Sequence, residues 1–145
     1  MRENFQTILS FTFIHEGIHS NDPCDPGGDT KYGIARLMHP EITDEQWANW
    51  SIADSEAMYL KMYWCGMGCD SLPYPLDMAV FDTAVNPGPG ACHHMLGLAA
   101  GDWKELINLR RSYYQARVLK DPTKQKYLKG WLNRCDDLEI LCNNK

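Results

Sequence analysis

Three side chains near the N-terminus have types and spacing suited to acid–base chemistry. Glu16 is followed nine residues later by Asp25, and Thr30 comes five residues after Asp25. Two carboxyl groups across a cleft are the layout of an inverting glycosidase: one protonates the leaving oxygen and the other activates water. A hydroxyl beside the second group can hold that water. The pattern therefore indicates Glu16 as the acid, Asp25 as the water-activating carboxylate and Thr30 as its helper.

The segment before Glu16 has the pattern of an amphipathic helix. Its apolar residues fall on one helical face, at Phe5, Ile8, Leu9 and Phe13. Glu16 continues this stripe. A carboxyl group at the end of a buried face is partly desolvated, which favours its protonated form and suits a general acid. The alternative is a helix-terminal glutamate that turns into solvent.

The segment after Glu16 is rich in proline, glycine and aspartate, and it is too poor in aliphatic residues to build core. It predicts a loop and a tight turn, after which residues 32–37 could close a small hairpin or a strand pair. Asp22, Asp25 and Asp29 could be considered as a metal-binding loop. They lack the alternating oxygen ligands and the terminal glutamate of an EF-hand, so we expect no metal here.

These residues also carry a family resemblance. The EG pair followed by ND-P-x-DPGG-x-TKYGI resembles the N-terminal signature of the glycoside hydrolase family 108 muramidases, found in phage endolysins and secretion-activator proteins. Further blocks agree in family order: MYW (62–64), LPYPLDMAVFDTAVNPGPG (72–90), LRRSYYQAR (109–117) and YLKGWLNR (127–134). One departure is Glu16-Gly17-Ile18-His19, where the family usually has EGGY. At position 18 this replaces a glycine, which tolerates positive φ, with isoleucine.

The resemblance implies a lysozyme-like fold and a peptidoglycan hydrolase. The expected reaction is that of an N-acetylmuramidase, cleaving the β-1,4 bond between N-acetylmuramic acid and N-acetylglucosamine in glycan strands. Glu16 would be the catalytic acid, acting with Asp25 and Thr30 and without a cofactor. A lytic transglycosylase on the same fold, which needs only the acid, is one alternative. A non-catalytic wall-binding protein is the other.

Four further residues are predicted to bind substrate. Tyr32 belongs to the TKYGI block, and Trp64 closes the MYW block. Trp64 could be a platform for a sugar ring or an anchor in the core, and both readings stay open. Asp82 and Asn86 stand four residues apart on one helical face. They could line the sugar cleft or brace a neighbouring helix.

Helix signals continue along the chain. Thr43 with Gln46 and Ser51 with Asp54 have the spacing of capping boxes. Prolines precede a small-sided helix at residues 76–85, and further helices are expected from 91 to 98, from 103 to 120 and from Thr123 onward. The inward faces of the last two are predicted as follows: Leu106, Leu109, Tyr113 and Arg117, then Tyr127, Leu128, Trp131, Leu132, Cys135 and Leu138. Arginines 110, 117 and 134 could support the site but more readily brace the scaffold.

The expected fold class is therefore α+β and predominantly α: one lysozyme-like domain over residues 1–145, with six or seven helices and a small β-hairpin patch. With 145 residues and 44% apolar content, the chain suits one compact domain. Members of the family that the chain resembles commonly have a segment similar to a peptidoglycan-binding repeat between the NPGPG-like block and the final helices. Here the corresponding segment, residues 96–103, is too short for a separate peptidoglycan-binding domain. Six cysteines permit three disulfides, or they are buried free thiols.

The net charge and the absence of targeting signals limit which partners and which cellular location we expect. A net charge of −5 and a pI near 5.4 argue against a nucleic-acid partner, and they give no long-range attraction to an anionic wall. No apolar stretch approaches the length of a membrane span. The start MRENFQTILS lacks the pattern of a signal peptide. We expect a monomer made in the cytoplasm of a phage-infected bacterium, reaching the wall after holin-dependent release.

Overall fold

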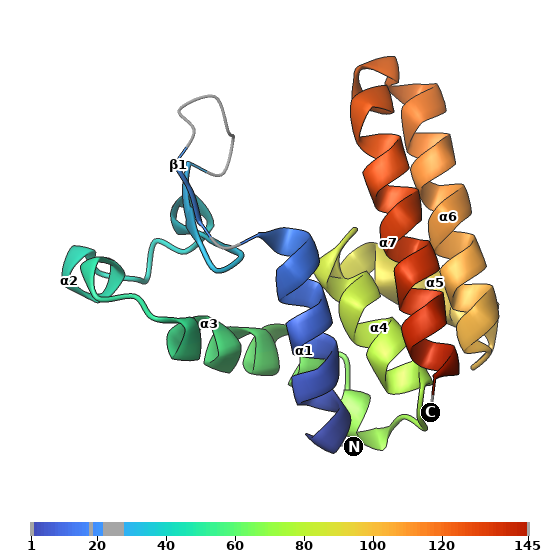
Figure 1. The fold of residues 1–145 in the computed structure, drawn as a ribbon, viewed down its shortest axis with the longest axis horizontal. Coiled ribbons are helices and arrows are strands. Elements are labelled where there is room, and N and C mark those ends of the chain that lie inside the picture. Colours follow the sequence, from blue (N-terminus) through green and yellow to red (C-terminus); the bar gives the residue numbers. More distant parts are fainter. Residues whose placement is uncertain (1, 18, 22–27, 145) are drawn as a thin grey trace.

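The computed structural model describes residues 2–17, 19–21 and 28–144 (Figure 1). Within them, helices predominate and one small antiparallel sheet is present, so the predicted fold class is confirmed. The helices are α1 (Arg2–Glu16), α2 (Asp44–Ala48), α3 (Ile52–Tyr59), α4 (Leu76–Val85), α5 (Pro89–Ala99), α6 (Trp103–Lys120) and α7 (Gln125–Asn143). The strands are β1 (His19–Asn21), β2 (Asp29–Lys31) and β3 (Ile34–Ala35). Shorter helical turns span Arg36–Met38, Leu60–Cys65, Cys69–Ser71 and Pro122–Lys124.

Helix α4 lies at the centre of the larger part of the molecule. All of its residues from Leu76 to Ala84 are buried, and α1, α5, α6 and α7 contact it. Small side chains such as Ala79 and Ala84 let these neighbours approach closely. Helices α6 and α7 form an antiparallel pair, while the sheet, α2 and α3 lie on the other side of α1 (Figure 1). We call this second part the small lobe.

Most local signals in the sequence are confirmed. The Thr43 and Ser51 side chains both form complete capping boxes, and Asp102 accepts hydrogen bonds from the first backbone amides of α6. The last helix differs from the prediction. The Asp121 side chain caps a short turn at Pro122–Lys124, so α7 starts at Gln125 rather than at Thr123.

The buried face of α6 is rotated by one residue from the predicted one. Arg110 and Tyr114 are fully buried, whereas Tyr113 and Arg117 are exposed. The predicted inward face was wrong because it left out Arg110, for which the sequence favoured a role in bracing the scaffold. In the structure its guanidinium pairs with a buried carboxylate, which makes burial possible.

Trp64 is a core residue. Its side chain is 0% exposed, and its ring centroid lies 5.5 Å from that of Phe5 and 5.9 Å from that of Phe81. Its indole nitrogen donates to Asp70 Oδ1 at 2.9 Å. A fully buried ring cannot meet a glycan, so the prediction that Trp64 binds substrate is wrong. The core-anchor reading holds.

The described cysteines are free thiols, and four of the five are buried. Burial raises the pKa of Cys69, Cys92 and Cys142 to about 12, which makes these thiols unreactive. They behave as small apolar side chains. Cys24 lies outside the described residues. None of the described helices is both long enough and apolar enough to span a membrane.

The hairpin between β2 and β3 turns through two residues, Tyr32 and Gly33. Both have positive φ, 46° and 80°, as the type I′ turn requires. The pairing of Lys31 with Ile34 confirms the hairpin expected near residues 32–37. Thr30 also pairs with Ser20 of β1, so β2 is the central strand.

Replacing Gly33 with alanine is expected to lower the free energy of unfolding by about 2–3 kcal/mol. The added Cβ would collide with the hydroxyl of buried Tyr59 in a backbone conformation that disfavours side chains. Urea unfolding measures the loss. Gly101→Ala is the matched control, because Gly101 has a similar φ of 89° but an added Cβ would have no neighbouring atom within 4 Å. This variant should lose only about 1 kcal/mol of unfolding free energy. Equal losses would show that the collision is harmless.

Candidate active site

Glu16 is the last residue of α1, and the structure places it at a cleft. Ile8, Leu9 and Thr12 are buried on one face of the helix, and Glu16 lies at the end of this buried stripe, as predicted. Its side chain keeps 24% exposure. The cleft in front of it has a volume of about 350 Å³, and its lining residues are His15, Glu16, Asn86, Lys126, Tyr127, Gly130, Trp131 and Arg134.

Arg134 of α7 holds the Glu16 carboxyl group. Its Nη1 donates to Glu16 Oε1 at 2.6 Å. Its other two nitrogens bind Asp82 of α4: Nη2 donates to Oδ1 at 2.8 Å and Nε to Oδ2 at 3.0 Å. One guanidinium thus joins two carboxyl groups from different helices. Because Arg134 is 4% exposed and bound on three nitrogens, it gives Glu16 a fixed orientation.

Asp82 is the centre of a buried polar network. Besides Arg134, it accepts hydrogen bonds from Thr12 Oγ1 at 2.7 Å and from Arg110 Nη1 at 2.8 Å. We call Thr12, Glu16, Asp82, Arg110 and Arg134 the Asp82 network. Its members come from four helices, α1, α4, α6 and α7.

The arginines also determine the charge state of Asp82. Burial alone would raise its pKa, but the charges of Arg134 and Arg110 and the hydrogen bonds of the network hold the pKa well below its usual range. Asp82 is therefore an ionised group with no exposed surface. The prediction that it contacts substrate is wrong. It braces neighbouring helices, which was the alternative.

Asn86 does reach the cleft. Its Oδ1 accepts a hydrogen bond from the Tyr114 hydroxyl at 2.6 Å, and that hydroxyl also accepts from Arg110 Nε at 3.3 Å. Asn86 and Glu16 both line the cleft, so the structure brings these two predicted residues together. A contact between Asn86 and substrate stays a prediction.

Two aromatic residues of α7 line the cleft although the sequence pattern placed them in the core. Tyr127 is 46% exposed, and half-buried Trp131 stacks on Tyr114 with 4.8 Å between ring centroids. Tyr127 packs against Trp131 at 5.6 Å. Such rings offer flat apolar surfaces with polar edges, which suits carbohydrate binding. The YLKGWLNR block contained the signal, because Tyr127, Trp131 and Arg134 share one helical face.

The other predicted residues belong to the small lobe or lie outside the described residues. Tyr32, Gly17 and Phe13 line a second, mainly apolar cavity of about 460 Å³. One of its lining residues, Gly17, directly follows Glu16 in the chain. Thr30 is half-buried in β2, and its hydroxyl donates to the Gly28 carbonyl oxygen at 3.4 Å. Asp25 and Ile18 are not among the described residues.

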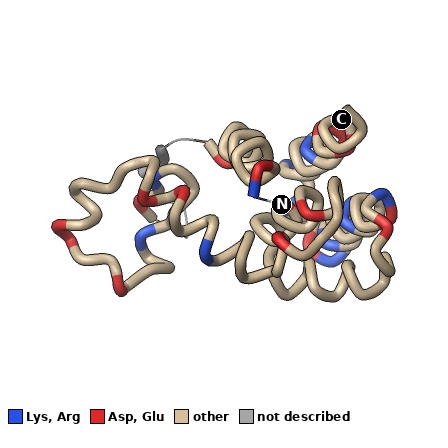
Figure 2. The backbone as a smooth tube through the Cα atoms, turned by 90° about the horizontal axis from the view of Figure 1, so that it is seen from below, with Lys and Arg blue, Asp and Glu red and all other residues tan. Residues whose placement is uncertain are grey.

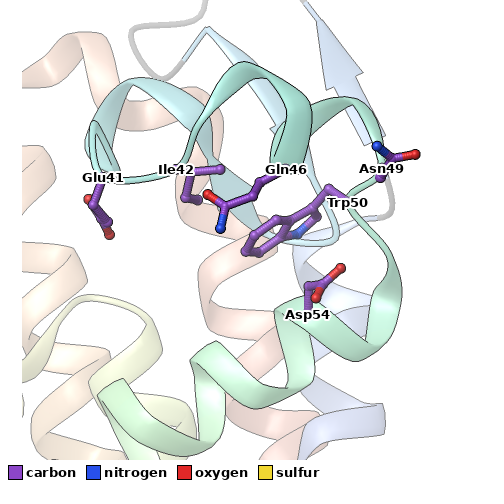
Figure 3. Close-up of a pocket in the computed structure, with 6 residues that line it drawn as sticks. All are labelled: Glu41, Ile42, Gln46, Asn49, Trp50 and Asp54. Atoms are coloured by element: carbon purple, nitrogen blue, oxygen red, sulfur yellow. The ribbon is translucent and has the colours of Figure 1, made fainter.

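A third cavity, of about 380 Å³, lies in the small lobe between α2 and α3 (Figure 3). Its polar groups have structural partners: Gln46 Oε1 accepts from the Thr43 amide and Asp54 Oδ2 from the Ser51 amide. The Trp50 indole donates to Ser55. Glu16 does not line this cavity, so its geometry supports no catalysis.

No group of three metal-ligating side chains forms within residues 2–17, 19–21 and 28–144. Of the three aspartates considered for a metal loop, Asp22 and Asp25 lie outside these ranges. Asp29 accepts a hydrogen bond from the Trp47 indole at 2.8 Å.

Comparison with known proteins decides the family. A family model described as glycosyl hydrolase 108 matches residues 9–88, more than half of the chain. The chain belongs to this family. The matched range of the glycosyl hydrolase 108 model contains Glu16, Asp25, Thr30 and Asp82, whereas Arg134 lies beyond it. Membership makes the protein a glycoside hydrolase, in a family whose substrate is peptidoglycan.

A solved structure shares the fold of this glycosyl hydrolase 108 member. The protein titled SagA from Brucella abortus aligns with a TM-score of 0.79 and 20% sequence identity, over 100% of this chain and 98% of that chain. At this identity the likeness shows the fold alone. It confirms the lysozyme-like architecture over the whole length. No curated protein matches the sequence.

Proposed function

We propose that this glycoside hydrolase is an N-acetylmuramidase. It cleaves the β-1,4 bond between N-acetylmuramic acid and N-acetylglucosamine in peptidoglycan strands. The observation that carries the proposal is the position of Glu16: a partly exposed carboxyl group, held by one buried arginine, that lines a cleft together with two aromatic side chains. That is the arrangement a positioned general acid needs.

In the proposed reaction, Glu16 gives its proton to the glycosidic oxygen as the bond from that oxygen to the anomeric carbon breaks. The sugar passes through an oxocarbenium-like state, and Asp25 takes a proton from the water that attacks it. Thr30 helps to hold this water. Arg134 then faces a newly formed carboxylate at 2.6 Å, so it stabilises charge that develops during proton transfer.

The walls of the cleft suggest how a glycan lies. Tyr127 and Trp131 of α7 offer flat surfaces in the Glu16 cleft, and Tyr32 of the small lobe lines the cavity that includes the neighbouring Gly17. We propose that sugar rings on either side of the scissile bond pack against these aromatic residues. Asn86, which also lines the cleft, would hydrogen-bond to a sugar substituent.

The proposed biological setting is lysis of the bacterial wall. As an endolysin, the protein would act as a monomer after holin-dependent release from the cytoplasm of the infected host. This proposal rests on the resemblance of the sequence motifs to those of phage endolysins. The chemistry proposed here needs no cofactor, because protonation and water activation are both supplied by side chains.

Product analysis of peptidoglycan digests tests the proposal. The wild type should release fragments with reducing muramic acid ends, identified by mass spectrometry, and Asp25→Asn should release roughly 100-fold fewer. Products with anhydro ends that survive Asp25→Asn would instead indicate a lytic transglycosylase. If folded wild-type protein releases nothing from several wall types, it is a wall-binding protein on this fold.

A further inference from the structure

Positive charge gathers at one end of the α6–α7 pair. Between residues 117 and 129 the chain has five basic residues and one acidic residue, a net charge of +4. Because the whole chain carries −5, the remaining residues carry −9. We call the five basic residues the basic tip: Arg117, Lys120, Lys124, Lys126 and Lys129. Figure 2 views the molecule from the opposite end, where acidic and basic residues are distributed over the other elements.

The basic tip is open to a ligand. Four of its side chains are exposed and Lys124 is half-buried. Within the described part of the chain, none of the five forms an ion pair within 4 Å, in contrast to Arg111 of α6, which binds Asp136 and Glu139. Unpaired cations on the surface attract anions within about 8–10 Å, even when the distant net charge is negative.

The basic tip is continuous with the Glu16 cleft through two aromatic rings. Arg117 lies 5.5 Å from the ring centroid of Trp131, and Lys124 and Lys126 lie 5.9 Å and 5.1 Å from that of Tyr127. Both rings line the cleft, and Lys126 lines it too. On the outer side, a cavity of about 620 Å³ is lined by Tyr113, Ala116, Arg117, Lys120, Asp121 and Lys124.

We propose that the basic tip binds the carboxylates of the peptide stems that peptidoglycan carries on its muramic acid residues. This inference rests on the proposed function, because a glycan seated in the cleft would carry its stems past Tyr127 and Trp131. Arg117, Lys124 and Lys126, which lie beside these rings, would then form ion pairs with the stem carboxylates. Stem-bearing strands are therefore preferred over bare glycan, although the protein as a whole is acidic.

Two double variants test the proposal. Lys120→Gln with Lys124→Gln removes two charges from the basic tip, and neither residue lines the Glu16 cleft. Lys61→Gln with Lys104→Gln removes two exposed charges elsewhere, and Lys104 matches Lys124 because it also lies over an aromatic ring, 5.4 Å from that of Trp103. Both variants are measured on peptidoglycan freed of phosphate polymers and on the same glycan stripped of stems by an amidase. The amidase removes the stem carboxylates and leaves one lactyl carboxylate on each muramic acid.

The tip variant should raise KM on stem-bearing peptidoglycan by roughly three- to tenfold, with kcat unchanged. Its KM on stripped glycan, and both constants of the control variant, should match the wild type. An unchanged KM on stem-bearing substrate would overturn the proposal. An equal rise on stripped glycan would overturn it too.

Co-sedimentation with the same two substrates separates this proposal from the proposed function. Wild-type protein should sediment more with stem-bearing than with stripped material, and the tip variant should lose that difference, whether or not turnover occurs. Protein without turnover that still shows the difference would defeat the muramidase proposal and leave this one standing. Equal sedimentation of wild type and tip variant would defeat the stem-binding proposal.

Discussion

Replacing Glu16 with glutamine is expected to lower the rate of peptidoglycan hydrolysis by roughly 10²–10⁴-fold, which is the usual contribution of a positioned general acid. Glutamine has nearly the same shape but no acidic proton to give. The fold should be retained, because Arg134 keeps its two hydrogen bonds to Asp82. Release of reducing ends under saturating substrate measures the loss.

Glu3→Gln is the control for this experiment. Glu3 lies in the first turn of the same helix, is exposed, and does not line the cleft. Its replacement changes the net charge of the protein equally and should leave the rate within twofold of the wild type. If Glu16→Gln retained more than about a tenth of the wild-type rate, another group would have to supply the proton.

Replacing Asp82 with asparagine is expected to lower the free energy of unfolding by about 3–5 kcal/mol. The substitution leaves Arg110 fully buried with no carboxylate, and it leaves Arg134 with Glu16 alone. A buried charge without its partner keeps its full desolvation cost. Denaturant unfolding followed by circular dichroism measures the loss.

Asp136→Asn provides the comparison. Asp136 pairs with Arg111 at 2.9 Å, close to the distances within the Asp82 network, but its side chain is 62% exposed. Water screens such a pair, so its removal should cost less than about 1 kcal/mol. Similar losses of unfolding free energy in the two variants would mean that a buried ion pair contributes no more to stability than an exposed one.

The pH dependence of stability provides a second check on Asp82. Its folded-state pKa is depressed by the two arginines, so its contribution is fully present above the unfolded-state pKa of about 4. Stability must therefore fall as the pH drops below about 4, where the unfolded chain takes up a proton first. Asp82→Asn should lack this component of the acid-induced loss.

The helices could be predicted because their ends are encoded locally. Thr43, Ser51 and Asp102 each supply an oxygen to backbone amides two or three residues away, and no distant contact is needed. The same is true of Glu16, whose position follows from the apolar period of α1 alone. Local chemistry was therefore sufficient for most of the fold and for one functional residue.

The misjudged residues depend on partners far along the chain. Arg110 is buried because Asp82, 28 residues earlier, is buried too. Trp64 and Trp131 both lie in helical segments, yet one lies in the core and the other lines the cleft. What distinguishes them is the packing of whole helices, namely Phe5 and Phe81 around the first and Tyr114 beneath the second.

The Asp82 network has a consequence for building hybrid enzymes. The family model ends at residue 88, which invites a crossover there, with α6 and α7 taken from a relative. Such a graft would separate Glu16 and Asp82 from the arginines that bind them. Recombined chains should survive only when the incoming segment brings guanidinium groups at the places of Arg110 and Arg134. The two halves of this protein are therefore not interchangeable modules, because the ion pairs of the Asp82 network join them.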